Sequence, residues 1–321
     1  MLKIVINGAD DAGALPDLSI LGDDLDIAFA GDARSLAAAL PGCRVLLGWD
    51  FRGAELEECW GLAHDLAWIQ WCGAGVDSVL FPELAESDVV LTNARGIFDR
   101  AMAEYALALI LAWAKDLPGT LEAQARTEWH YRRTARIDGT RMAVIGVGSI
   151  GRAVAKLARD VGIEVTGIGR TARSGVPVFG DVADSESMAE IVAEADWVVA
   201  VLPKTDATID LFDEAFFRSM KTGGHFINLG RGASLDEAAL CRALGGGRIA
   251  AAALDAYKSE PLPEESPLWR QPGLIVSPHM SGDYHGFEPD LITLFGENLK
   301  RFRAGEPLIN VVDKRSGYVR D

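Results

Sequence analysis

The stretch RMAVIGVGSIGRAVAKLARDVGIEVTGIG, residues 141–169, decides the fold of this chain. An apolar run typical of a buried strand leads into three glycines with the spacing GxGxxG, and a helical pattern and a second apolar run follow. The first glycine permits the tight turn, the second lets a pyrophosphate approach the backbone, and the third lets the helix pack on the strand. Because the N-terminus of a helix attracts anions, the stretch predicts a dinucleotide-binding unit. The residues expected to bind are Gly146, Gly148, Ser149, Ile150 and Gly151. The alternative is a glycine turn kept for packing alone.

The end of the second strand in this stretch indicates which dinucleotide fits. A domain that prefers NAD(H) carries an Asp or Glu there, which bonds the ribose 2′-hydroxyl. This chain instead has Gly169, followed by Arg170, Thr171 and Arg173. Without the carboxylate a 2′-phosphate is not repelled, and two guanidinium groups and a hydroxyl can donate hydrogen bonds to it. The sequence therefore favours NADP(H) over NAD(H), with a solvated loop of arginines as the alternative.

Apolar runs alternate with helical patterns along the rest of the chain, which predicts parallel sheets with helical crossovers. The early runs lie at 2–7, 43–49, 66–71 and 89–93. An apolar helix is expected over 100–115, between two packed layers. The later strands are RMAVIG, EVTGIG, WVVAVLP, GHFINLG, RIAAAALDAY and LIVSP, with helical segments near 149–161, 186–194, 213–219, 235–244 and 287–303. Six such strands match a complete doubly wound nucleotide domain.

Three polar residues follow three of the later strands, where ligands bind in open parallel sheets. Arg231 follows GHFINLG, Glu260 follows RIAAAALDAY after a short loop, and His279 follows LIVSP. A guanidinium can bind the carboxylate of a 2-keto acid and polarise its carbonyl, and an imidazolium can protonate the oxygen while a nicotinamide delivers hydride. A carboxylate beside the imidazole favours its charged form. Taken singly, the three residues could be a turn arginine, a surface acid and a loop histidine.

Composition and charge exclude several classes of protein. The chain has 321 residues, of which 49% are hydrophobic and 24% charged, as in an ordinary globular protein of two domains. Its net charge of −16 disfavours nucleic acids and anionic membranes as partners, and no apolar run approaches the roughly 18 residues of a membrane span. The four cysteines lack a CxxC spacing, so no metal site or redox dithiol is expected. The N-terminus lacks the apolar segment of a signal peptide, which favours a cytoplasmic location.

The motifs GVGSIG, LPKTDATIDLF, INLGRGASLDEAAL, LDAYKSEPLP with SPLW, and SPHMSG resemble the motif series of the D-2-hydroxyacid dehydrogenase family. WCGAGVDSV and MAEYALALIL fit as well, so the resemblance covers most of the chain. It implies an α/β fold of two Rossmann-like domains with parallel sheets, in which a dinucleotide-binding domain is inserted into a discontinuous flavodoxin-like substrate-binding domain. The implied boundaries are 1–101 and 285–321 for the substrate-binding domain and 102–284 for the dinucleotide-binding domain. Members are usually homodimers through the nucleotide domain. Trp129 could lie in a dimer arm, although an ordinary packed tryptophan is the simpler expectation.

The resemblance also implies residue roles. Arg231, Glu260 and His279 would be the substrate arginine, its acid partner and the proton donor. Ala74 and Gly75 would offer backbone amides to the substrate carboxylate. The residues implied to line the cofactor cleft are Pro203, Thr208 and Asp255.

Other positions bear on the substrate. Trp49 resembles the aromatic pocket residue of some glyoxylate and hydroxypyruvate reductases. The usual Val-Phe after the family aspartate is Ala256-Tyr257 here, and the segment after His279 ends in Asp283, which would disfavour a second anionic group. The chain is therefore expected to reduce a small anionic 2-keto acid, such as glyoxylate or hydroxypyruvate, to the D-2-hydroxy acid with NADPH. The alternatives are a dehydrogenase of a bulkier or 3-phosphorylated 2-keto acid and a nucleotide-sensing binding protein of the same fold.

Overall fold

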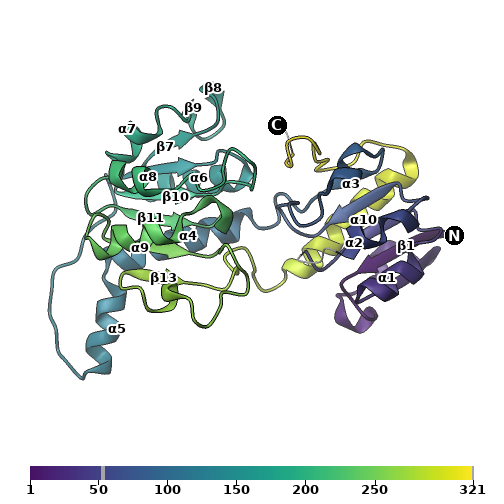
Figure 1. Cartoon of the computed structure of the whole chain (residues 1–321), viewed down its shortest axis with the longest axis horizontal. Helices are drawn as coiled ribbons and strands as arrows, with labels where there is room; N and C mark the ends of the chain where they lie inside the picture. Colours follow the sequence, from purple (N-terminus) through teal and green to yellow (C-terminus); the bar gives the residue numbers. More distant parts are fainter. Residues whose placement is uncertain (52–54, 320–321) are drawn as a thin grey trace. The chain divides into compact units, whose positions relative to one another are not determined.

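The computed structural model of the chain describes residues 1–51 and 55–319. The chain forms two compact units, each with its own sheet (Figure 1). The first unit comprises Met1–Phe98 and Tyr284–Asp321, and the second comprises Asp99–Asp283. The first unit thus ends at Phe98 rather than at the expected residue 101, because helix α4 begins at Asp99. It resumes at Tyr284 rather than at the expected residue 285.

The first unit contains a parallel sheet in the order β2-β1-β3-β4-β5. Its strands are β1 (Leu2–Asn7), β2 (Leu25–Ala30), β3 (Val45–Gly48), β4 (Trp68–Trp71) and β5 (Val90–Thr92). This is the flavodoxin-like order. Strand β2 is absent from the sequence-based expectation because Asp26 interrupts its apolar pattern.

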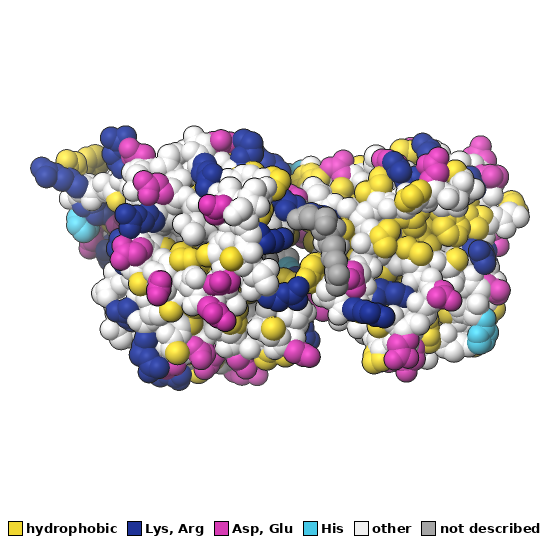
Figure 2. Space-filling view, turned by 90° about the horizontal axis from the view of Figure 1, so that it is seen from above, with side chains coloured by type: hydrophobic (Ala, Val, Ile, Leu, Met, Phe, Trp, Pro, Cys, Tyr) yellow, Lys and Arg dark blue, Asp and Glu magenta, His cyan; other side chains and the backbone are white. Residues whose placement is uncertain are grey.

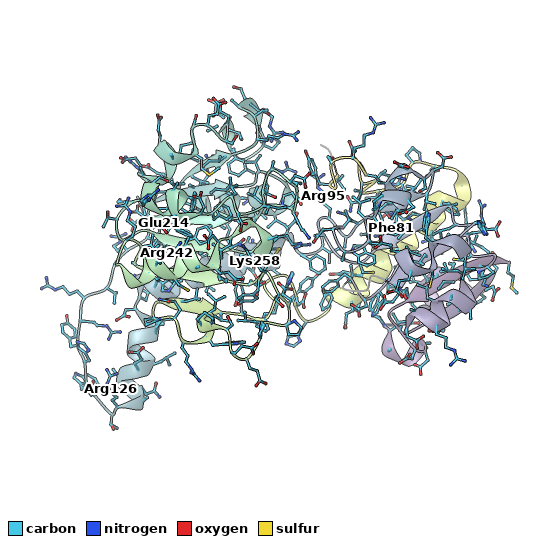
Figure 3. The ribbon with its side chains drawn as sticks, viewed as in Figure 1. Phe81, Arg95, Arg126, Glu214, Arg242 and Lys258 are labelled. Atoms are coloured by element: carbon cyan, nitrogen blue, oxygen red, sulfur yellow. The ribbon has the colours of Figure 1, made fainter. Side chains whose placement is uncertain are left out.

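Helices cover this sheet, and one of them comes from the far end of the chain. They are α1 (Ala33–Ala39), α2 (Glu55–Cys59), α3 (Pro82–Glu86) and α10 (Phe287–Ala304), with 3-10 turns at Ala12–Ala14, Ser19–Leu21 and Trp60–Leu62. Phe295 and Phe302 of α10 pack on Trp68 with ring centroids 5.3 and 5.5 Å apart. Phe81, labelled in Figure 3, stands edge-on to Trp60. Aromatic packing therefore joins the C-terminal segment to the N-terminal sheet.

The second unit contains a larger sheet in the order β13-β12-β11-β10-β6-β7-β9-β8. Its strands are β6 (Arg141–Ile145), β7 (Glu164–Ile168), β8 (Arg173–Val176), β9 (Gly180–Ala183), β10 (Trp197–Ala200), β11 (His225–Asn228), β12 (Ala251–Leu254) and β13 (Leu274–Val276). All neighbours are parallel except the hairpin β8–β9. The strand order reverses between β6 and β10, as in a doubly wound nucleotide fold. The α/β fold with two parallel sheets is thus confirmed, and the short, mostly polar hairpin is the addition that the sequence pattern did not predict.

The helices of the second unit bury the apolar faces of its sheet. They are α4 (Asp99–Ala114), α5 (Leu117–Ala125), α6 (Ser149–Asp160), α7 (Met188–Val192), α8 (Glu214–Ser219) and α9 (Glu237–Gly245), with 3-10 turns at Gly232–Ser234 and Pro267–Arg270. Glu214 and Arg242 form a 2.7 Å ion pair between α8 and α9 (Figure 3). The apolar pattern predicts only one helix in this region, over 100–115, whereas a second helix, α5, follows it with Pro118 in its first turn, where proline is tolerated.

The segment after α5 corrects one expectation. Trp129 is 99% exposed rather than packed. It follows Arg126, which lies at the end of α5 (Figure 3). Leu121 in α5 and Tyr131 are also exposed. We call α5 and the chain that follows it, residues 117–140, the arm. The arm therefore presents apolar and aromatic side chains at its surface.

The cysteines and the charged side chains lie where the composition leads one to expect them. Cys43, Cys59 and Cys72 are buried free thiols, and burial raises the pKa of the Cys43 thiol to about 11, which makes it unreactive. Basic and acidic side chains are interspersed over both units on the face shown in Figure 2. Among the described residues, no helix combines the length and the apolar character needed to cross a membrane.

Candidate functional site

The glycine turn between β6 and α6 has the geometry that a dinucleotide requires. Gly146 has φ +107°, and a Cβ there would lie 2.7 Å from the carbonyl oxygen of Val201. A Cβ on Gly151 would lie 1.9 Å from the carbonyl oxygen of Gly146, so only glycine lets α6 approach the strand. At Gly148, in contrast, a Cβ would meet nothing within 4 Å. The first and third glycines are thus required by the fold, whereas the second leaves open space on the side where a pyrophosphate would lie.

The start of α6 leaves donors for that phosphate. Gly148 is the N-cap and supplies no side-chain hydrogen bond to the helix, so the first N–H groups of α6 remain available to an anion. Ser149 donates its hydroxyl to Oδ1 of Asp99 at 3.2 Å, and it and Ile150 stand in the first turn. The residues at this turn therefore fit a dinucleotide through their backbone.

The predicted 2′-phosphate residues lie where β7 ends and β8 begins. Arg170, Thr171 and Arg173 are exposed there. The guanidinium of Arg173 reaches back along the hairpin, so that its Nη2 lies 3.6 Å from the position of a Cβ on Gly169. A positive charge therefore stands beside the position where a domain selective for NAD(H) places its carboxylate.

Two further predicted cofactor residues lie in the loop after β10, next to the glycine turn. Thr208 closes this loop, because its hydroxyl donates to the carbonyl oxygen of Pro203 at 2.8 Å and accepts the N–H of Thr205 at 2.9 Å. Ala200 at the end of β10 is paired in register with Ile145 at the end of β6. The loop therefore stands at the point where the strand order reverses, which is where ligands of such sheets bind.

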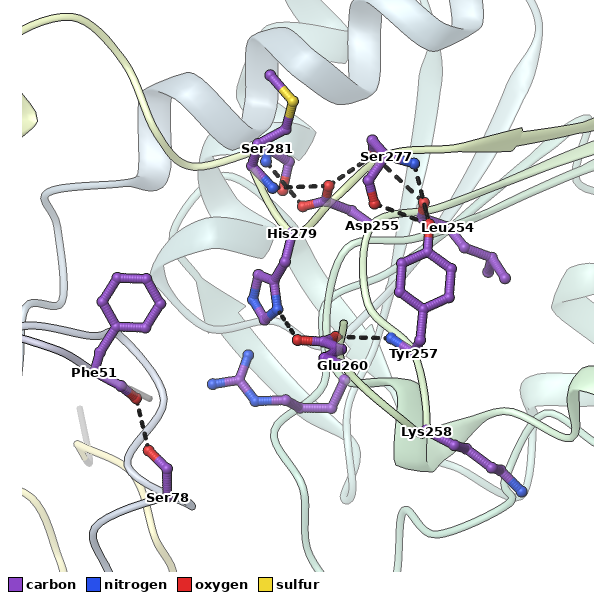
Figure 4. A network of polar contacts seen from close by, with 12 residues as sticks. Phe51, Ser78, Leu254, Asp255, Tyr257, Lys258, Glu260, Ser277, His279 and Ser281 are labelled. Carbon is purple, nitrogen blue, oxygen red and sulfur yellow. Dashed lines mark hydrogen bonds and ion pairs between the residues drawn. The ribbon is translucent and has the colours of Figure 1, made fainter. Parts of the chain in front are cut away.

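The structure brings the three predicted catalytic residues together at the ends of adjacent strands. His279 Nδ1 lies 2.7 Å from Oε2 of Glu260, and Oε1 of Glu260 accepts the N–H of Tyr257 at 2.8 Å (Figure 4). Arg231 follows β11 and is held by its backbone carbonyl, which accepts hydrogen bonds from Ser234 and Asn228. Strands β11, β12 and β13 are neighbours, so residues 231, 260 and 279 meet at one edge of the sheet.

The electrostatics of Glu260 support an ionised carboxylate. Burial favours the neutral form and works to raise its pKa. The hydrogen bonds from His279 and from the Tyr257 N–H, together with the positive charges of His279 and Arg231, outweigh the burial and leave the pKa of Glu260 below its usual value. The positive charge of Arg231 thus acts on the carboxylate that is paired with His279. The arrangement can hold an imidazolium against a carboxylate beside a guanidinium.

A buried aspartate shapes the histidine loop, a role that the sequence did not predict. Asp255 was expected to line the cofactor cleft, but it is only 1% exposed and its carboxylate accepts three hydrogen bonds from that loop (Figure 4). Oδ1 accepts from the Ser277 hydroxyl at 2.6 Å and the Met280 N–H at 3.0 Å, and Oδ2 accepts from the Ser281 N–H at 2.8 Å. These bonds flank His279, whose φ of +53° is uncommon for a residue other than glycine. Asp255 therefore fixes the backbone that carries the proposed proton donor.

The predicted substrate residues of the first unit follow neighbouring strands. Trp49 comes directly after β3, and its N–H donates to the carbonyl oxygen of Asn7 at 2.8 Å. Ala74 and Gly75 follow β4, and the carbonyl of Ala74 accepts from the Asn93 side chain at 2.6 Å. The N–H groups of Ala74 and Gly75 donate to no other residue in the described part of the chain. This loop therefore presents backbone donors, as a carboxylate requires.

Comparison with known proteins agrees with this arrangement. A family model described as D-isomer specific 2-hydroxyacid dehydrogenase, NAD binding domain, matches residues 107–281. A family protein from Aeromonas salmonicida is 31% identical, with 98% of this chain and 99% of that chain covered and a TM-score of 0.85. A D-isomer specific 2-hydroxyacid dehydrogenase from Xanthobacter autotrophicus, solved with NADPH and MES, is 30% identical over 98% and 99% of the two chains, with a TM-score of 0.83.

A third similar structure carries a more specific name. It is the NADPH-dependent glyoxylate/hydroxypyruvate reductase of Sinorhizobium meliloti in complex with NADP and sulfate. It is 25% identical over 99% of this chain and 100% of that chain, with a TM-score of 0.86. The family model covers more than half of the chain and the structures nearly all of it, which confirms the resemblance indicated by the motifs. The chain belongs to the D-isomer specific 2-hydroxyacid dehydrogenase family, and its second unit contains the NAD(P)-binding domain of that family.

Proposed function

We propose that the protein reduces a small 2-keto acid to the D-2-hydroxy acid with NADPH. The observation that carries the proposal is the 2.7 Å pair of His279 and Glu260, with the charge of Arg231 acting on the same carboxylate. In this proposal the second unit binds the dinucleotide and supplies Arg231 and His279, and the first unit supplies the backbone donors of Ala74 and Gly75.

The residues would act on the substrate in one concerted step. Arg231 binds the substrate carboxylate and polarises the keto oxygen through its planar set of donors. Because Nδ1 of His279 is bonded to Glu260, Nε2 is the ring nitrogen that donates a proton to this oxygen. The ionised Glu260 stabilises the imidazolium before the transfer and holds the ring in place. When bound, NADPH would supply the hydride for the keto carbon and become NADP⁺. The other products would be the hydroxy acid and a neutral His279.

The preference for NADPH rests on charge at the end of β7. Gly169 supplies no carboxylate, and Arg170, Thr171 and Arg173 supply donors to a 2′-phosphate. Two of the similar structures contain NADPH or NADP, which supports the same preference here.

The choice of a small substrate rests on three features. Ala74 and Gly75 would offer donors to one carboxylate, and Trp49, directly after β3, would contribute a bulky aromatic side chain to the proposed pocket. Asp283 would repel a second anionic group. The similar Sinorhizobium protein acts on glyoxylate and hydroxypyruvate by its name. A bulkier 2-keto acid and a nucleotide-sensing role are the alternatives.

The protein is further proposed to be a homodimer through the second unit. Its arm exposes Trp129 at 99% and Tyr131 at 82%, and apolar surface of this kind marks protein interfaces. Light scattering at micromolar concentration would show a mass near twice 34.4 kDa. A monomer at that concentration would contradict the assignment.

The test of the function is the initial rate of NADPH and NADH oxidation across 2-keto acids from glyoxylate to phenylpyruvate. We expect the highest kcat/KM with NADPH and the smallest substrates. The double variant Arg170→Ala/Arg173→Ala should raise the KM for NADPH by roughly tenfold or more and leave that for NADH unchanged, because charge-assisted bonds to the 2′-phosphate are lost. Arg218→Ala, which removes an exposed arginine of α8, is the control. Nucleotide binding without turnover of any 2-keto acid would favour the sensing role.

A further inference from the structure

One buried polar atom in the first unit has no partner. The Trp71 side chain is 1% exposed, and its Nε1 is the buried side-chain nitrogen that forms no hydrogen bond within the described residues. Two other buried indoles are satisfied: Nε1 of Trp68 donates to Thr92 at 2.8 Å, and Nε1 of Trp197 donates to Thr140 at 2.9 Å. Leaving a buried N–H unpaired costs free energy, so such a group calls for an explanation.

Packing fixes the direction of this N–H. The benzo edge of the indole lies over Gly48 at the end of β3, where a Cβ would stand only 2.3 Å from Cε3 of Trp71. The opposite edge faces Gly73, where a Cβ would stand 3.1 Å from Nε1. Glycine at both positions makes room for the ring, which is therefore held with its N–H against the loop that follows β4.

The same loop contains the proposed carboxylate donors. The carbonyl of Gly73 accepts the N–H of Ala94 at 3.0 Å, and that of Ala74 accepts the Asn93 side chain at 2.6 Å. The carbonyls of Gly73 and Ala74 are thus used within the protein, whereas the N–H groups of Ala74 and Gly75 have no acceptor among the described residues. Trp71 Nε1 is a further donor beside this loop without an acceptor among the described residues, and a bound anion would supply one.

We propose that the indole N–H of Trp71 is a further substrate-binding donor, directed at the carboxylate of the bound 2-keto acid. The inference rests on the proposed function, because it takes the loop at residues 73–75 as the carboxylate site. Because Nε1 is buried against Gly73, the loop backbone moves away from the indole when the anion binds, and the glycines at 73 and 75 permit this movement. Trp71 would then set affinity for the substrate without taking part in proton or hydride transfer.

The test compares two tryptophans of the same strand. Trp71→Phe keeps an aromatic ring at this position but removes the N–H together with part of the buried indole. The KM for the 2-keto acid should rise roughly tenfold, as expected for a hydrogen bond to a charged group. The kcat and the Kd for NADPH should stay within about twofold, and Tm should fall because ring volume is lost from the core. Trp68→Phe is the matched control, since its N–H is bonded to Thr92; it should lower Tm and leave KM unchanged.

A second variant approaches the same N–H from the other side. Gly73→Ala retains the indole but places a methyl group 3.1 Å from Nε1, 3.1 Å from Cβ of Phe51 and 3.2 Å from the carbonyl oxygen of Gly75. Because the methyl group obstructs the space beside the N–H, KM should rise in the same direction as in Trp71→Phe. If Trp71→Phe does not fold, an unchanged KM in Gly73→Ala overturns the proposal. An unchanged KM in Trp71→Phe, where it folds, overturns it as well.

Binding of oxamate, a non-reducible analogue of a 2-keto acid, separates this proposal from the proposed function. Its Kd is measured by calorimetry with NADPH present, for the wild type and both variants. If the wild type reduces no 2-keto acid but binds oxamate, and Trp71→Phe weakens that binding tenfold, the donor assignment stands and the reductase proposal fails. If the wild type reduces 2-keto acids and oxamate binding is the same in Trp71→Phe, only the Trp71 proposal fails. A wild type that neither binds oxamate nor turns over would overturn both.

Discussion

The histidine loop after β13 and the glycine-rich loop after β4 both follow the carboxyl end of a parallel strand, but their hydrogen bonding differs. In the second unit, Asp255 accepts three hydrogen bonds around His279, and Glu260 accepts two more. In the first unit, the N–H groups of Ala74, Gly75 and the Trp71 indole donate to no described residue. The histidine loop is therefore held by hydrogen bonds within the protein, whereas the glycine-rich loop after β4 retains donors that a ligand would satisfy.

The largest effect should come from the centre of the histidine loop. His279→Ala removes the proposed proton donor and should lower kcat by about 10²- to 10⁴-fold, with the Kd for NADPH nearly unchanged. Stopped-flow or steady-state absorbance of NADPH measures the rate, and fluorescence measures cofactor binding. His64→Ala, in an exposed position of the first unit, is the control. A His279→Ala enzyme that keeps more than about a tenth of the rate would refute the assignment.

The next effect concerns the support of that loop. Asp255→Asn has nearly the same shape but replaces one acceptor oxygen with an NH₂ group, which leaves a buried N–H or hydroxyl of the loop unpaired. We expect kcat to fall by roughly 10- to 100-fold and Tm to decrease, since hydrogen bonds to a buried charge are lost. Steady-state kinetics and thermal denaturation are the measurements. Wild-type values for both would show that the three bonds do not position His279.

Hydrogen exchange compares the two loops directly. The amides of Met280 and Ser281 donate to a buried carboxylate and should exchange at least about tenfold more slowly than those of Ala74 and Gly75. Oxamate with NADPH should slow exchange at residues 74 and 75 and change residues 280 and 281 little. If the amides of residues 280 and 281 exchange as fast as those of residues 74 and 75 without ligand, the two loops do not differ in hydrogen bonding.

The smallest effect is on stability at acid pH. The pKa of Glu260 in the folded protein lies below its ordinary value of 4.5, so its carboxylate stabilises the fold fully above about pH 4.5 and loses that contribution as the pH falls through the folded pKa. Wild type should therefore be more stable than Glu260→Gln near neutral pH, and the difference should vanish at lower pH. Urea denaturation of both proteins across this range is the measurement. If the difference in the free energy of unfolding between the two proteins is constant with pH, the ionised carboxylate of Glu260 does not stabilise the fold.

Much of the fold could be predicted because its signals are local. Strands β6, β7 and β10 to β13 and the glycine turn follow from apolar runs and glycine spacing, and Gly146, Gly148 and Gly151 have the surroundings that their spacing indicated. Strand β2 and the hairpin β8–β9 were missed because their residues are partly polar and exposed. Arg231, Glu260 and His279 were predicted as a catalytic trio because each follows a strand, and the order of the strands in the sheet is what places them near one another.

The sequence by itself determined the glycine turn, the alternation of strands with helices and the identity of the residues at the strand ends, since these depend on neighbours within a few positions. The tertiary structure decided which groups are satisfied and which are left open. Asp255 takes its three donors from residues 22, 25 and 26 positions away, and Arg173 reaches the side of Gly169 through an unpredicted hairpin. The unpaired N–H of Trp71 also becomes visible only in three dimensions. A hydrogen bond depends on distance and direction between segments that the chain brings together late, and no local pattern encodes that geometry.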